Sequence, residues 1–87
     1  MGLEMVDLTM QVEDRFRIEI PDHEASQFET VGQLYDYVRG KLRPVGSDKW
    51  SDERIWLTLQ DIIVNQLGVP REAVVREAHF VRDFDAG

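Results

Sequence analysis

Apolar side chains recur at helical spacing in three separate stretches of this 87-residue chain, at residues 3–17, 31–42 and 52–67. A repeat of three to four residues places such side chains on one face of an α-helix. A chain of this length forms one small domain. The sequence therefore predicts a single all-α domain over residues 1–87, a four-helix bundle with three main helices and one short one.

Capping residues mark the ends of these helices. Thr30 is a suitable N-cap for the second long helix, and Ser51 or Asp52 for the third. Gly68 is expected to end the third helix, because glycine adopts left-handed backbone angles easily. Two shorter helical turns are expected as well. One lies around Ala25 and has Asp22 or Ser26 as its first residue, and the other covers residues 69–74.

Two segments are predicted to be loops. Residues 40–51 contain Pro44 and Gly46 among polar residues, and Trp50 is expected to anchor this connection. Residues 75–87 show no helical period. We expect them to form a long ordered loop that inserts three apolar side chains into the core: Phe80, Val81 and Phe84.

The first helix carries two separate apolar stripes. The stripe predicted to face the core consists of Met5, Leu8, Val12 and Phe16. The second stripe consists of Leu3, Val6 and Met10, and beside it lies a polar ridge of Glu4, Asp7, Gln11 and Asp14. A small bundle covers one stripe easily, so the second is either packed against a neighbouring loop or free to bind a partner. Apolar contact area beside carboxylates is typical of a partner-binding helix.

Charge is distributed unevenly along the chain, whose formal net charge is −7. Residues 1–36 hold nine carboxylates against two arginines, whereas residues 37–87 hold eight acidic and eight basic side chains. The acidic first part repels nucleic acid and anionic membranes and attracts a protein with a basic patch. The chain contains no cysteine, and no apolar run is long enough to span a bilayer. The acidic opening residues, with no positively charged segment before them, lead us to expect no signal peptide. We expect a cytoplasmic monomer.

Residues that could support catalysis or bind metal are scarce. The two histidines, His23 and His79, are expected to be a solvated surface residue and a core-edge residue, respectively. Asp83 and Asp85 resemble the opening of a calcium loop, but the remaining ligands do not follow. No nucleophile pattern or phosphate-binding glycine loop is present. We therefore expect a protein that is not an enzyme and that binds no metal.

Two blocks of the sequence resemble bacterial acyl carrier proteins, but in swapped order. The first block resembles the second, third and fourth helices of the family at Val6–Phe16, Glu19–Ala25, Thr30–Val31 and Tyr35–Val38. The second block resembles the family's first helix and long loop at Ile62–Ile63, Gln66–Val69 and Ala78–Asp83. The resemblance implies the carrier fold in circularly permuted form, with the chain opened beside the site where the family attaches its prosthetic group.

The family normally carries acyl groups on phosphopantetheine, which is attached through a serine hydroxyl. Gly2 stands at the place of that serine, and glycine has no hydroxyl, so no covalent cofactor is expected here. Ser26, Ser47 and Ser51 do not resemble the attachment site. The partner-binding positions implied by the resemblance are Leu3, Glu4, Val6, Asp7, Met10, Glu13 and Asp14.

These observations favour a carrier-like module without prosthetic group that binds a basic partner, for instance an acyl-processing enzyme of fatty acid or polyketide metabolism. One alternative is a phosphopantetheine-dependent carrier whose attachment residue is lost or replaced in this chain. The other is a non-covalent lipid binder, which would require a cavity beneath Leu8, Val12, Ile62 and Phe80.

Overall fold

In the computed structural model, which describes residues 3–43 and 50–84, the main elements are all helical. Their order is α1 (Leu3–Phe16), α2 (Asp22–Ala25), α3 (Val31–Leu42), α4 (Asp52–Leu67) and the short 3-10 helix η2 (Arg71–Ala73). The predicted all-α class is confirmed, as are the boundaries of the second and third long helices. In the described residues the only β-type pairing is an isolated bridge between Thr30 and His79.

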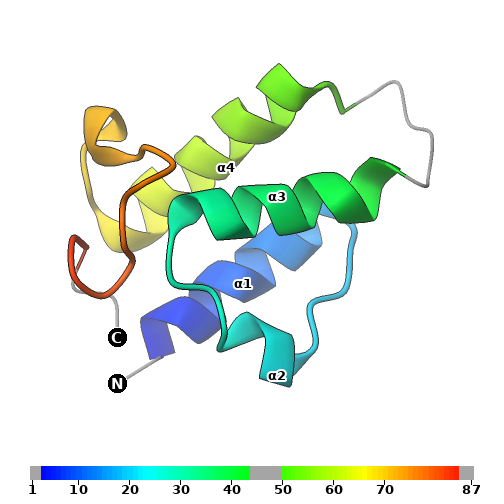
Figure 1. Cartoon of the computed structure of the whole chain (residues 1–87), viewed down its shortest axis with the longest axis horizontal. Helices are drawn as coiled ribbons and strands as arrows, with labels where there is room; N and C mark the ends of the chain where they lie inside the picture. The colour runs from blue at the N-terminus through cyan, green and yellow to red at the C-terminus, as the bar shows by residue number, and fades with distance from the viewer. Residues whose placement is uncertain (1–2, 44–49, 85–87) are drawn as a thin grey trace.

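Helices α1 and α3 both pack against α4, and α2 packs against α1 (Figure 1). The side chains enclosed between them form one core, to which the segment after η2 also contributes. Its largest fully buried members are Phe16, Phe80, Leu8, Leu34, Ile55, Leu59 and Ile63. The predicted inner stripe of α1 is thus confirmed, with Met5 partly buried at its edge.

Helix α1 ends in a left-handed turn at Arg17, whose φ is 58°. The amide of Ile18 donates to the carbonyl of Glu13 at 3.2 Å, which is the backbone bond of a Schellman motif. The Glu13 carboxylate then accepts a hydrogen bond from the amide of Ile20 at 2.8 Å. These contacts turn the chain sharply and direct Ile20 into the core, where it is 5% exposed.

The start of α3 is fixed by a capping box. The Thr30 hydroxyl accepts from the Gln33 amide at 3.2 Å, and the Gln33 side chain accepts from the Thr30 amide. Two further amides of the first turn, those of Val31 and Gly32, donate to the carbonyls of Ala78 and Arg76, each at 3.0 Å. The segment after η2 therefore completes the N-terminus of α3.

The predicted insertion of residues 75–84 into the core holds for Phe80 and partly for Phe84, but it is wrong for Val81. Phe80 is fully buried, and its amide donates to the Glu29 carbonyl at 2.9 Å. Val81 is 54% exposed. The reason is local: the Asp83 amide closes a turn onto the His79 carbonyl at 2.8 Å, so the chain leaves the core immediately after Phe80.

Both ends of α4 are as predicted. The Ser51 hydroxyl accepts from the Arg54 amide, which identifies Ser51 rather than Asp52 as the N-cap, and Gly68 ends the helix with a φ of 68°. Just before α4, the ring of Trp50 lies 4.7 Å from that of Phe16, so Trp50 anchors its end of the connection as expected. The middle of that connection, residues 44–49, lies outside the described residues.

Candidate functional site

The outer face of α1 exposes two large apolar side chains. Val6 is 52% exposed and Met10 is 55% exposed, and the polar residues Asp7, Gln11 and Asp14 are exposed beside them. Described residues from elsewhere in the chain thus leave Val6 and Met10 largely uncovered. The predicted second stripe is present at these two positions; we call Val6, Asp7, Met10 and Asp14 the α1 outer face.

Three of the predicted partner-binding residues are not part of this surface as described. The side chains of Leu3 and Glu4 lie outside the described part of the structure. Glu13 is half-buried and accepts a hydrogen bond from the backbone beyond the helix, which gives its carboxylate a structural role at the turn after α1. Sequence spacing places Glu13 on α1, but it gives no sign of this bond to Ile20.

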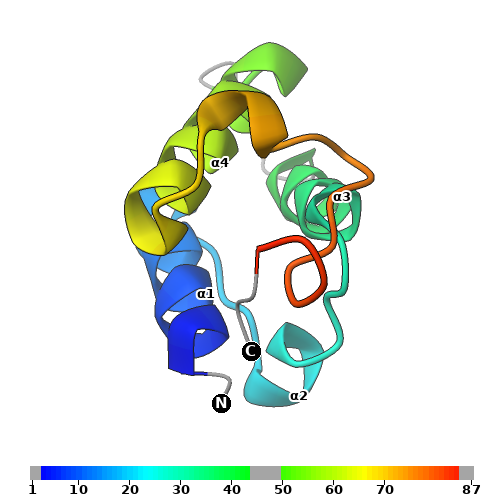
Figure 2. The same ribbon diagram turned by 90° about the vertical axis from the view of Figure 1, so that its left-hand side faces the viewer.

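The position predicted to replace the attachment serine, Gly2, also lies outside the described residues. The described residues on either side of the expected junction between the two chain ends can be placed. The start of α1 and the turn that ends at Phe84 lie at the same end of the molecule, as Figures 1 and 2 both show.

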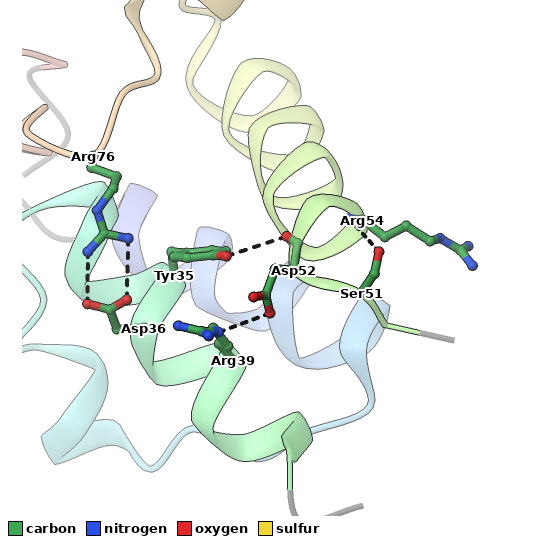
Figure 3. Close-up of polar contacts among 7 residues, drawn as sticks. All are labelled: Tyr35, Asp36, Arg39, Ser51, Asp52, Arg54 and Arg76. Atoms are coloured by element: carbon green, nitrogen blue, oxygen red, sulfur yellow. Dashed lines mark hydrogen bonds and ion pairs between the residues drawn. The ribbon is translucent and has the colours of Figure 1, made fainter. Parts of the chain in front are cut away.

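A group of paired charges around the ring of Tyr35 joins α3, α4 and the segment after η2 (Figure 3). The Arg76 guanidinium donates to both carboxylate oxygens of Asp36, at 3.0 and 3.3 Å, and lies 5.4 Å from the centre of the Tyr35 ring. This contact with Asp36 raises the pKa of Arg76. On the neighbouring turn, Arg39 donates to Asp52 at 3.0 Å. These arginines are already paired, so the group fastens elements together.

The chain has an open surface hollow between α2 and α3. It has a volume of about 550 Å³ and is lined by His23, Glu24, Gln27, Phe28, Gln33 and Tyr37. Burial, followed by the neighbouring carboxylates of Glu24 and Glu13, raises the pKa of Tyr37 to about 12. Sequence analysis did not predict this hollow, because it arises from the placement of two helices rather than from a local motif.

A second, smaller hollow of about 340 Å³ lies between η2 and the turn that follows, lined by Ala73, Val75, Glu77, Ala78, Asp83 and Phe84. Neither hollow is lined by the four residues beneath which a lipid cavity was expected, Leu8, Val12, Ile62 and Phe80. All four are buried in the common core.

The two histidines lie in different parts of the structure, His23 in α2 and His79 in the segment after η2. His23 is highly exposed and its Nε2 lies 3.8 Å from the Glu24 carboxylate. His79 is half-buried, and its Nδ1 accepts from the Arg82 amide at 3.2 Å, which stabilises the turn after Phe80. Within residues 3–43 and 50–84, no three acidic or histidine side chains are grouped so as to hold a metal ion. Over the same residues, no helix has the length and apolar character of a membrane span.

No protein-family model matches this chain, and no solved structure matches it.

Proposed function

We propose that this protein is a carrier-type domain in rearranged order that acts as a binding module for a basic protein partner and bears no covalent prosthetic group. The proposed partner is an acyl-processing enzyme of fatty acid or polyketide metabolism in the cytoplasm. The observation that supports it best is the α1 outer face, where Val6 and Met10 are each more than half exposed beside Asp7 and Asp14.

The chemistry of this face suits such a partner. Met10 is unbranched and flexible, so it adapts to apolar surfaces of different shape. The carboxylates of Asp7 and Asp14 attract a basic patch and increase the rate of encounter. The helical arrangement and the swapped order of the two resembling blocks support the carrier-type assignment, as does the common location of the start of α1 and the turn ending at Phe84.

The direct test measures binding to a fatty-acid ketosynthase with a basic surface. Met10→Ser removes the apolar contact from the proposed interface without changing the charge and is expected to weaken binding about tenfold. Leu57→Ser is the matched control, since Leu57 is 46% exposed on α4 and undergoes a comparable change. Binding that is absent, or that both variants weaken equally, contradicts the proposal.

A further inference from the structure

The hollow between α2 and α3 combines an aromatic surface with a carboxylate. A short connecting segment leads from α2 to the start of α3 (Figures 1 and 2), and residues from both helices line the hollow. The rings of Phe28 and Tyr37 meet edge to face in the hollow, with their centres 5.1 Å apart. Glu24 contributes a carboxylate to the same lining. An aromatic face next to a carboxylate is suited to a cation that has flat or apolar surface.

The electrostatic surroundings also favour a positive charge. Carboxylates of Glu24 and Glu13 act on the Tyr37 hydroxyl in the direction that opposes its ionisation. The chain itself supplies a cation to the same ring, because the Lys41 ammonium lies 5.4 Å from the centre of Tyr37. The Tyr37 ring thus already contacts one positive group of the chain.

Among biological cations, the guanidinium group fits this lining best. It is planar, stacks on aromatic rings and donates to both oxygens of a carboxylate, whereas an ammonium is compact and strongly hydrated. The amide oxygen of Gln27 can accept a further guanidinium N–H. The oxygen of Gln33 is engaged, since it accepts from the amides of Glu29 and Thr30 at 2.6 and 3.2 Å.

We propose that the hollow between α2 and α3 binds an arginine side chain of a partner protein, stacked on the ring of Phe28, beside Tyr37, and paired with Glu24. No residue of the α1 outer face lines this hollow. The proposal is therefore independent of the function proposed above, and each can fail without the other.

The test is an amide-resolved NMR titration of the whole protein with N-acetyl-arginine amide and, in parallel, with N-acetyl-citrulline amide. Citrulline has nearly the shape of arginine but carries no charge. We expect saturable shifts of the Phe28 and Tyr37 amides with the arginine compound, and binding at least about fivefold weaker with citrulline, as for loss of a cation–aromatic contact together with an exposed ion pair. No saturable shift, or equal binding of both compounds, overturns the proposal.

Two substitutions with the same charge change locate the site. Glu24→Gln is expected to weaken arginine binding about threefold to fivefold. Glu72→Gln makes the same change at an exposed residue of η2, which packs against α4, and is expected to leave binding unchanged. If Glu72→Gln weakens binding as much as Glu24→Gln, the attraction is that of an acidic protein in general and the site is disproved. Phe28→Leu, which keeps an apolar side chain, is expected to weaken binding by removing the stacking surface; unchanged binding contradicts the proposed geometry.

Discussion

The backbone amide of Gly32 donates a hydrogen bond to the carbonyl oxygen of Arg76, 3.0 Å away, and so joins the first turn of α3 to the segment after η2. A Cβ atom added to Gly32 would meet that same oxygen at 3.1 Å. The contacted oxygen belongs to the backbone and accepts this hydrogen bond. It therefore moves away less easily than the end of a flexible side chain would.

Two glycines of α3 should therefore respond oppositely to alanine. Gly32→Ala is expected to lower the free energy of unfolding by about 1 kcal/mol, because steric overlap outweighs the better helix propensity. Gly40→Ala is expected to raise it by about 0.5–1 kcal/mol, because nothing lies within 4 Å of the added Cβ. Urea unfolding of both variants measures the difference. Stabilisation by Gly32→Ala contradicts the close packing of this segment on α3.

The two helices that end in left-handed turns give a second opposed pair. Arg17 has a φ of 58° and Gly68 a φ of 68°. A side chain in this conformation costs about 1 kcal/mol, so Arg17→Gly should stabilise the protein by about that amount and Gly68→Ala should destabilise it similarly. Thermal unfolding of the two variants tests this. If both substitutions change the stability in the same direction, the backbone is not left-handed at one of the two sites.

Phe80 and Val81 are neighbours in the chain with very different expected contributions. Phe80→Ala removes a fully buried ring and is expected to cost about 3–5 kcal/mol. Val81→Ser changes a side chain that is 54% exposed and is expected to alter stability by about 0.5 kcal/mol or less. Chemical unfolding checks both. A large cost at Val81 would restore the sequence-based prediction that this valine inserts into the core.

Stability is expected to fall at alkaline pH through Tyr37, whose pKa is raised from its ordinary value of 10.0 to about 12. A raised pKa means that folding favours the protonated phenol. This contribution is fully present below about pH 10 and is lost as the pH rises towards 12. Unfolding measured across this range should show a decline that Tyr37→Phe reduces, and the same decline in that variant contradicts the assignment.

Sequence reasoning succeeded where the signal was local. The period of apolar residues and the caps Thr30, Ser51 and Gly68 define α3 and α4 with their observed ends. Helix α1 ends at Phe16 and not at Arg17, because Arg17 turns left-handed so that Ile18 can bond to Glu13.

Contacts between distant segments could not be predicted in this way. Asp36 and Arg76 are 40 positions apart, and neither has a neighbour in sequence that indicates the pair. The same applies to the hollow between α2 and α3, which depends on how a four-residue helix lies against a longer one. On α1, spacing identified which side chains face outward at Val6 and Met10, but it could not show that Glu13 bonds to the turn beyond the helix.

The carrier-type assignment is tested most directly by intact mass after incubation with a phosphopantetheinyl transferase and coenzyme A. The unmodified sequence is expected to gain no mass. The variant Gly2→Ser restores the family's serine at the proposed junction and is expected to gain one phosphopantetheine group on that serine. The same variant is also to be tested in a chain reordered to begin at residue 50 and end at residue 43, with Gly87 joined to Met1. A mass gain of the serine variant in either chain order supports the carrier-type assignment. No mass gain of the variant in both chain orders contradicts it.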